Sequence, residues 1–155
     1  MTKVVDSSIR KSMIRERGKY VIDTDKTRLQ TDAIYKFLSE DSYWATKRTL
    51  EQTLTAIENS ICFGIYHENR QIGFARVVSD RATFAYLGDV YVIEEFRGRG
   101  LSKWLMETII AHPELQGLRR WVLATRDAHG LYEKYGFEPL VFPERWMERA
   151  AEDAY

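Results

Sequence analysis

Apolar and polar positions along the chain repeat with two different periods, which separates candidate strands from candidate helices. Runs of β-branched and aromatic residues predict strands at 20–23, 61–66, 72–78, 83–93 and 121–124. Apolar residues three and four positions apart predict helices over 29–38, 46–60, 100–111 and 128–135. A final extended segment at 137–142 completes the order strand, two helices, three strands, helix, strand, helix, strand.

The short turn at 67–70 predicts that the strands on either side of it form an antiparallel hairpin, which the next strand extends into a meander. The helix over 46–60 is expected to bury one stripe that carries Leu50, Leu54 and Ile57. Strands interleaved with helices indicate an α/β fold, with helices on both faces of a mixed sheet. In such a sheet, an anion site is expected where a strand ends and a helix begins.

The chain has 155 residues, of which 45% are hydrophobic and 30% charged, as is typical of one soluble globular domain. We expect that domain over 19–145, between a partly ordered basic extension at 1–18 and a tail at 146–155. Lysine and arginine total 23, and so do aspartate and glutamate. This balance argues against a nucleic-acid partner, and any anion site must be local.

The single cysteine, Cys62, lies in an apolar run, so neither a disulfide within the chain nor a multi-cysteine metal site is expected. His67, His112 and His129 are widely spaced, and we expect them at the surface without a metal. No stretch approaches the roughly 20 apolar residues of a membrane span, and the N-terminus lacks a signal-peptide pattern. We therefore expect a cytoplasmic protein with no membrane partner.

The segment from Arg97 to Lys103 follows a strand and leads directly into an amphipathic helix. The first amides of a helix lack intrahelical partners, and the helix dipole makes this end partly positive. Gly98 and Gly100 would let a phosphate approach those amides, while Arg97, Arg99 and Lys103 add positive charge. The segment matches neither the P-loop nor the three-glycine dinucleotide pattern. Taken alone, it is explained equally well as an ordinary turn before a helix.

Two motifs resemble those of one family. The pattern Arg97-x-x-Gly100-x-Ser102 resembles the pyrophosphate signature Gln/Arg-x-x-Gly-x-Gly/Ala of the GNAT superfamily of N-acetyltransferases, with serine at the last position. Residues 128–137 resemble the family's Ala-x-x-Leu-Tyr-Glu-Lys-x-Gly-Phe segment. The resemblance implies a single-domain, mostly antiparallel sheet in which two strands splay apart to form an acyl-CoA cleft. Here that cleft would lie between 87–93 and 121–124.

The resemblance also implies which residues bind acetyl-CoA, the cosubstrate. Those expected at the pyrophosphate are Arg97, Gly98, Arg99, Gly100, Leu101, Ser102 and Lys103. Those expected along the pantetheine arm and the thioester are Val90, Tyr91, Val92, Thr125, Ala128, Leu131 and Tyr132. Thr125 stands where the family commonly has asparagine, so a hydroxyl would replace an amide contact. A backbone amide of 90–92 would hold the oxyanion.

Transfer of an acetyl group to an amine calls for a base at the amine and an acid at the departing thiolate. The resemblance places the Tyr132 phenol beside the thioester sulfur, as the acid; a buried core tyrosine is the alternative. Asp89 is the candidate base, because strand alternation would place it among Leu87 and Tyr91, where burial would raise its pKa. Equally open are Asp89 as the cap of a bulge or an arginine's partner, with a water chain as the base.

The acceptor is expected to be a primary amine of a small molecule or peptide. Tyr43, Trp44 and Asp89 are expected to contact it, with tail residues Phe142, Trp146 and Met147 completing the pocket, although burial in the core is equally open for these aromatics. Glu40 and Asp41 would either attract a cationic substrate or, as is more frequent for acidic residues at a helix end, be solvated without a partner. The alternative to an enzyme is an acyl-CoA sensor without chemistry, or an interaction module that uses 97–103. A homodimer is left open.

Overall fold

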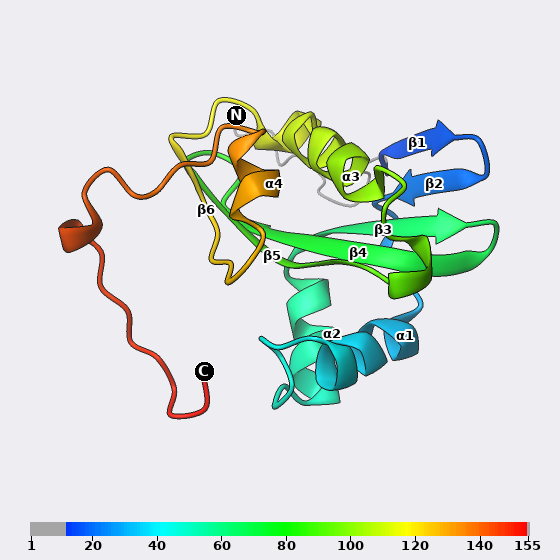
Figure 1. Ribbon diagram of the computed structural model, residues 1–155, viewed down its shortest axis with the longest axis horizontal. Helices are drawn as coiled ribbons and strands as arrows, with labels where there is room; N and C mark the ends of the chain where they lie inside the picture. The colour runs from blue at the N-terminus through cyan, green and yellow to red at the C-terminus, as the bar shows by residue number, and fades with distance from the viewer. Residues whose placement is uncertain (1–11, 155) are drawn as a thin grey trace, which may run out of the picture.

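A computed structural model describes residues 12–154, and its centre is a six-stranded sheet (Figure 1). The strands lie side by side in chain order from β1 to β6. Neighbours from β1 to β5 are antiparallel, and β6 is parallel to β5. Their bounds are Ile14–Arg17 (β1), Tyr20–Asp23 (β2), Ile61–His67 (β3), Arg70–Ser79 (β4), Phe84–Val92 (β5) and Arg120–Val122 (β6).

Helices cover both faces of the sheet, as predicted. Helices α1 (Thr31–Lys36) and α2 (Leu50–Glu58) lie on one face, and α3 (Leu101–Ile110) and α4 (His129–Glu133) lie on the other (Figure 1). A wider helical turn, closed by a bond from the Ser42 amide to the Phe37 carbonyl at 3.0 Å, extends α1 over Phe37–Asp41. Short 3-10 turns cover Lys26–Arg28, Glu94–Phe96, Pro113–Leu115 and Pro143–Arg145.

Each face of the sheet has its own apolar core. The core under α3 includes Phe63, Ile65 and Leu105, all fully buried. The core under α1 and α2 includes Ile34 and the Phe37 and Tyr91 rings, which stack with centroids 3.8 Å apart. Because side chains on both faces of β3 and β4 are buried, these strands read in the sequence as continuous apolar runs.

The start of α2 is set by its cap. The Thr49 hydroxyl accepts from the Gln52 amide at 3.1 Å, and the Gln52 side chain accepts from the Thr49 amide at 2.9 Å. This capping box begins the helix at Leu50, four residues after the predicted start at 46. The predicted range therefore included a non-helical loop, and that loop lies at the site described below.

The predicted apolar stripe of α2 is wrong. Ile57 is buried, but Leu50 and Leu54 are 42% and 43% exposed. The buried row instead runs from Thr53 to Ile57, which are one helical turn apart. Leu54 is rotated from Thr53 by about 100° around the helix axis, which turns it away from the sheet.

Both ends of the chain differ from the prediction. Within the segment predicted as an extension, Ile14–Arg17 forms β1 and pairs with β2; residues 1–11 lie outside the described residues. This edge strand is mostly exposed, so no alternation of buried and exposed positions marks it in the sequence. At the other end, no strand forms between 137 and 154, and residues 138–154 are exposed (Figure 1).

The splayed strand pair that the resemblance implied is present. Strands β5 and β6 pair only through Phe84–Arg120, Ala85–Trp121 and Tyr86–Val122, which are the first three residues of β5 and the whole of β6. Beyond Tyr86, β5 continues to Val92 without β6 as a partner. The predicted fold class, a single-domain mixed and mostly antiparallel sheet with helices on both faces, is confirmed.

Candidate active site

The segment between β5 and α3 has the backbone conformation of an anion cradle. Gly98 and Gly100 both have φ +76°, in the left-handed region that favours glycine. Gly100 is the N-cap of α3 and supplies no side chain to the first amides of the helix. Within residues 12–154, the amides of 98–102 make no bond to a backbone acceptor outside regular helix and strand ladders. This end of α3 therefore keeps donors available for an anion.

The space in front of these amides is open. A Cβ atom built on Gly98 or Gly100 would meet no other atom within 4 Å. Leu101, by contrast, is buried and anchors the start of α3 in the core, while Ser102 is half-buried beside it. The residues present therefore fit a pyrophosphate that lies against the backbone of 98–102.

The arginines of this segment hold the loop in place. Arg97 donates from Nε to the Val92 carbonyl at 2.9 Å, which ties the loop to the end of β5. Arg99 donates to the Tyr20 hydroxyl at 3.1 Å and lies over the Phe96 ring at 5.2 Å. Lys103 is exposed, and its carbonyl accepts from the Tyr135 hydroxyl at 3.0 Å, which joins α3 to the end of α4.

A bulge interrupts β5 before its last residues. The pairing with β4 passes from Arg76–Gly88 to Phe74–Tyr91, so β5 contains one residue more than β4 across this interval. Asp89, at the bulge, has φ +53°, a region that aspartate tolerates better than most side chains. The bulge exchanges the faces of the strand, because Leu87 and Val92 face the core under α3 while Tyr91 faces the core under α1.

Past the bulge, one edge of β5 is free for a ligand. The Ile93 amide donates to the Ile72 carbonyl of β4 at 2.9 Å. Amides alternate between the two edges of a strand, so the Val92 amide points to the opposite edge, where β6 has diverged. Residues 90–92 thus present backbone groups to the cleft.

Asp89 is a buried carboxylate that joins three segments. It is 6% exposed, and its Oδ2 accepts from Arg76 Nε at 2.5 Å and from Arg48 Nη1 at 2.6 Å. Its Oδ1 accepts from Trp44 Nε1 at 2.9 Å. The carboxylate therefore ties the loop before α2 and strand β4 to the bulge of β5.

Two expectations about Asp89 are wrong. Strand alternation placed it on a common face with Leu87 and Tyr91, but the bulge separates those residues onto opposite faces. A raised pKa was expected; burial does favour the neutral form, but the charges and hydrogen bonds of Arg76 and Arg48 outweigh it and lower the pKa. A carboxyl that stays ionised and is already bound by three donors is poorly suited to accept a proton near neutral pH.

Tyr132 lies in α4 with its ring against Phe137 at a centroid distance of 6.0 Å, edge to face. The side chain is 8% exposed. Burial raises the pKa of the phenol to about 12, and Tyr43 and Asp127 nearby add to the rise. The phenol therefore keeps its proton throughout the neutral range.

The loop before α4 brings the second motif to the cleft. The Thr125 hydroxyl accepts from the Ala128 amide at 3.0 Å, so Thr125 stabilises the turn into α4. Ala128 and Leu131 are half-buried and pack against the core under α3. This arrangement fixes the position of Tyr132 relative to β6.

The loop from α1 to α2 closes the other side of the site. The Tyr43 hydroxyl accepts from the Arg126 amide at 2.9 Å, and the Arg126 guanidinium lies 3.9 Å from the centre of the Tyr43 ring. Trp44 contacts Tyr43 edge to face at 5.1 Å and donates to Asp89. Both rings are more than a third exposed, so the alternative that they belong to the core is wrong.

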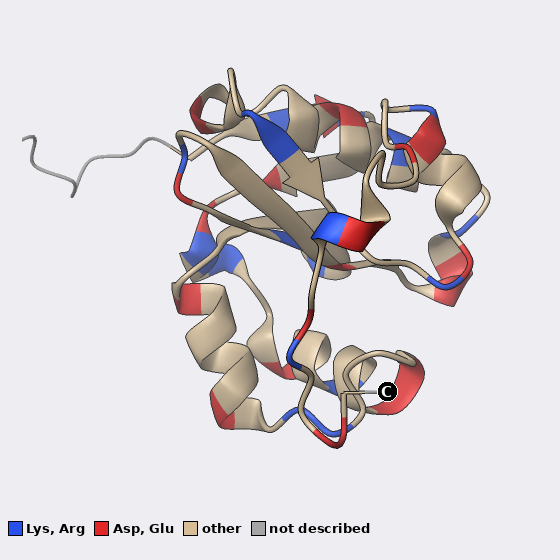
Figure 2. Cartoon of the chain, turned by 90° about the vertical axis from the view of Figure 1, so that its left-hand side faces the viewer, with Lys and Arg blue, Asp and Glu red and all other residues tan. Residues whose placement is uncertain are grey.

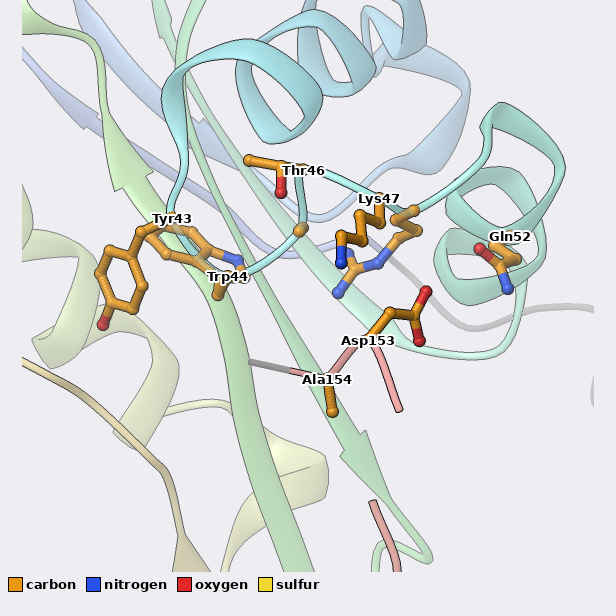
Figure 3. A pocket seen from close by; sticks show the side chains of 9 residues that line it. Tyr43, Trp44, Thr46, Lys47, Gln52, Asp153 and Ala154 are labelled. Atoms are coloured by element: carbon orange, nitrogen blue, oxygen red, sulfur yellow. The ribbon is translucent and has the colours of Figure 1, made fainter. Parts of the chain in front are cut away.

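A pocket of about 360 Å³ opens beside these rings (Figure 3). We call it the loop pocket. Its lining residues are Tyr43, Trp44, Ala45, Thr46, Lys47, Arg48, Gln52, Asp153 and Ala154. Figure 3 shows Trp44, Lys47 and Gln52 around the space that the tail residues Asp153 and Ala154 enter. The pocket therefore lies between the loop before α2 and the end of the chain.

Several expected acceptor contacts lie elsewhere. Phe142, Trp146 and Met147 are exposed and do not line the loop pocket; Trp146 packs under the Arg120 guanidinium at 4.8 Å instead. Because no strand forms after 137, these aromatics are not carried back to the cleft. Glu40 and Asp41 are exposed and also lie outside the pocket lining, whose charged residues from the body of the protein are basic.

Sequence reasoning did not single out Lys47, Arg48 and Arg76. Arg76 had a recognisable signal, since it is a lone charge in an apolar strand, and Asp89 is a lone charge in the next strand of the same meander. A charged residue at such a position is rarely buried unless it is paired. The contribution of Lys47 and Arg48 had no comparable signal, because it depends on where the α1–α2 loop folds.

Cys62 and His112 take structural positions. Cys62 is 1% exposed, and burial raises the pKa of its thiol to about 11. His112, expected at the surface, is buried against the Phe63 ring, and its Nδ1 accepts from the Glu114 amide at 3.2 Å.

No group of metal-binding side chains occurs within residues 12–154, and no helix there is long and apolar enough to span a bilayer. Basic and acidic positions are interspersed along the chain in Figure 2.

Comparisons with known proteins agree with this fold. The model of the acetyltransferase (GNAT) family matches residues 31–137. The protein FG08082 of Gibberella zeae, whose name classes it with the acetyltransferases, is 35% identical over 140 residues, with 76% of this chain and 78% of that protein covered. A crystal structure of a GNAT-family protein from Xanthomonas campestris is 53% identical, with a TM-score of 0.84 over 85% of this chain and 93% of that one.

A more distant structure shares the fold alone. A GNAT-family acetyltransferase from Elizabethkingia anophelis, solved with acetyl-CoA bound, is 18% identical with a TM-score of 0.58 over 89% of this chain and 92% of that one. The fold together with the family match defines an acetyltransferase of this class. The chain belongs to the GNAT acetyltransferase family.

Proposed function

We propose that this protein is an N-acetyltransferase that moves an acetyl group from acetyl-CoA to a primary amine of a small molecule or peptide, by direct attack in a ternary complex. The observation that carries the proposal is the unobstructed row of amides at the start of α3, which lies at the end of a bulged strand with a free edge. The amides at the start of α3 suit a pyrophosphate, and the unpaired edge of β5 next to them suits the extended pantetheine arm that follows it.

In this proposal the backbone of 98–102 binds the pyrophosphate, and Val92 with its neighbours Val90 and Tyr91 aligns the arm along the free edge of β5. The thioester then reaches the region between the bulge and Tyr132. Family membership and the sharing of this fold with an acetyl-CoA-bound relative support the choice of cosubstrate.

The reaction needs one bond formed and one broken. The amine nitrogen attacks the carbonyl carbon, an N–C bond forms, and the C–S bond breaks to release a thiolate. Tyr132 gives its proton to that sulfur. A pKa of about 12 makes the phenol a weaker acid than an exposed tyrosine, but the same dry surroundings raise the basicity of the sulfur, so the two shifts partly cancel.

The amine must lose a proton before or during attack, because an ordinary lysine-like amine has a pKa near ~10.4. We propose that water accepts it. Asp89 is held ionised by Arg76 and Arg48, so we assign it to positioning: it sets the bulge and attaches the α1–α2 loop to the cleft.

The test is acetyl-CoA turnover over a panel of primary amines, followed by release of the free CoA thiol, with acetyl-CoA binding measured separately by isothermal titration. We expect saturable binding and amine-dependent thiol release. Binding without release for any amine would assign the protein as an acyl-CoA sensor. Absence of binding would remove both functions.

A further inference from the structure

The loop pocket is positively charged where it meets the body of the protein. Lys47 and Arg48 both line it, and Gln52 places it at the first turn of α2, whose dipole adds partial positive charge. The carboxylate of Asp89 is shared by two guanidinium groups, so the cluster around it keeps one positive charge in excess. An acceptor entering here meets cations.

These cations keep donors available. Arg48 uses Nη1 on Asp89, and within residues 12–154 its Nε and Nη2 make no further ion pair or hydrogen bond. Its side chain is 22% exposed, so the guanidinium is held at the pocket wall by Asp89. Lys47 makes no salt bridge within the same residues. A fixed guanidinium beside a free ammonium suits the binding of an oxyanion.

The chain itself places a carboxylate at this position. Asp153 lines the loop pocket with Lys47 and Arg48, without forming a salt bridge to either (Figure 3). The chain itself therefore places negative charge beside these cations without an ion pair to either of them. The exposed Glu40 and Asp41 do not contribute to this lining.

The loop pocket also adjoins the chemistry. Trp44, on its wall, donates to Asp89 at the bulge, and Tyr43 contacts Arg126 in the loop that leads to α4. Tyr43 lies near enough to Tyr132 to influence the pKa of its phenol. A molecule with one end against Lys47 and Arg48 thus has its other end between the aromatic rings and the cleft.

We infer that the acceptor is an amine that carries an oxyanion, a carboxylate or a phosphate, which Lys47 and Arg48 bind in the loop pocket while the aromatic rings of Tyr43 and Trp44 pack against its apolar part. This inference rests on the proposed function, since it names the substrate class of the same site. It differs from the alternative in which Glu40 and Asp41 attract a cationic acceptor.

The experiment compares matched acceptors with the full-length protein. Amino acids with the amine one, two or three carbons from the carboxylate are assayed against their carboxamides, which have similar size but no charge. Aminoethyl phosphate against ethanolamine distinguishes phosphate from carboxylate. We expect the best acidic acceptor to exceed its uncharged counterpart at least tenfold in kcat/KM. Equal or better use of the uncharged member of every pair would overturn the inference.

A lysine variant tests the assigned contact. Lys47→Gln should raise KM for the preferred acidic acceptor about tenfold and leave KM for its uncharged counterpart unchanged, with kcat little affected. Lys36→Gln, which removes an exposed lysine at the end of α1, is the matched control and should change neither. Equal effects of the two substitutions on the acidic acceptor would count against the loop pocket.

A binding measurement keeps this inference separate from the proposed function. N-acetylated amino acids and their carboxamides are titrated into the protein with CoA present, so no turnover is needed. Tighter binding of the acids, lost in Lys47→Gln, supports the loop pocket even if no amine is acetylated. If acetylation occurs and the acids bind no better than the amides, the function stands and the substrate class is wrong.

Discussion

At the bulge of β5, one carboxylate connects segments that are far apart in the sequence. The Asp89 carboxylate accepts hydrogen bonds from Trp44 and Arg48 in the loop before α2 and from Arg76 in β4. Burial of a charge is costly unless partners replace its water, and here three donors do so. The left-handed conformation of Asp89 adds a backbone cost that the same contacts offset. This residue is best understood as the anchor of the α1–α2 loop.

Asp89→Asn should therefore destabilise the fold more than it alters the chemistry. Leaving Arg48 and Arg76 without their counter-ion should cost about 3 kcal/mol or more and lower Tm by about 10 °C. Glu95→Gln removes an exposed partner of Arg70 and should leave Tm unchanged. Differential scanning calorimetry makes the comparison, and equal Tm for wild type and Asp89→Asn would contradict the anchoring role.

The pH dependence of that effect follows from the lowered pKa of Asp89. A carboxyl whose folded pKa is depressed stabilises the protein above its unfolded pKa of about 3.9, and this contribution is lost as pH falls through the lower folded value. The Tm difference between wild type and Asp89→Asn should be constant from pH 5 to 8 and narrow below about pH 4.

The pH–rate profiles of the same two proteins test the base. Parallel profiles from pH 5 to 8 would agree with water as the base, whereas recovery of the variant's rate at high pH would restore Asp89 to that role.

Tyr132→Phe isolates the phenolic proton, because the ring and its packing on Phe137 remain. We expect kcat to fall by about 10²-fold or more with little change in acetyl-CoA affinity. Since the folded pKa is raised to about 12, the phenol stays protonated at every usual assay pH. The two pH–rate profiles should therefore have the same shape from pH 6 to 9.5 and differ only in height. Unchanged kcat would make Tyr132 a packing residue.

At the scale of elements, the sequence predicted what depends on local pattern. The hairpin of β3 and β4, helix α3 and the glycine cradle were all recognisable, since each combines apolar period with turn or glycine positions. Periodicity alone does not reveal the bulge in β5, because one inserted residue reverses the face of every position after it. That reversal is why Leu87 and Tyr91 were wrongly placed together.

Other differences between the predicted and the observed elements arise where tertiary contacts determine the structure. Strand β1 forms through backbone pairing with β2 and has few buried side chains, so its sequence carries no alternation. Which face of α2 is buried depends on the packing of Ile57 against the sheet. The positions of Leu50 and Leu54 in the sequence do not reveal that packing. The loop pocket brings residues 43–48 together with 153–154, a contact between segments about a hundred residues apart that no local pattern encodes.

Gly100→Val tests the cradle. The left-handed φ makes a branched side chain unfavourable by about 1–2 kcal/mol, but no atom lies within 4 Å of the new Cβ, so the protein should fold. The added side chain would occupy the space in front of the amides, and acetyl-CoA affinity should fall at least 100-fold by isothermal titration. Gly117→Val is the matched control, since Gly117 has φ +70° and is equally open but lies away from the site. Similar affinity in both folded variants would rule out the cradle.

On the scale of the whole molecule, the sheet is incomplete where it would bind its cosubstrate. Strand β6 is short and pairs only with the first three residues of β5. Helix α4 and the loop before it are therefore joined to the rest mainly by packing under α3 and by the Tyr43–Arg126 contact. A ligand in the cleft would touch both separated parts. Binding should then stabilise the folded state as a whole and also reduce local opening near β6.

This coupling gives a measurable outcome. At a concentration of 100 times Kd, acetyl-CoA should add about 2.7 kcal/mol to the free energy of unfolding, which raises Tm by roughly 5–11 °C for a chain of this length. Hydrogen exchange should slow along β6 and the loop to α4, and also in the first turn of α3, because the ligand bridges these segments. Gly100→Val should show neither effect, while Gly117→Val should show both. Protection confined to α3, with β6 exchanging as fast as in the free protein, would mean that the cradle binds the pyrophosphate while the arm does not enter the cleft, and would place the chemistry elsewhere than beside Tyr132.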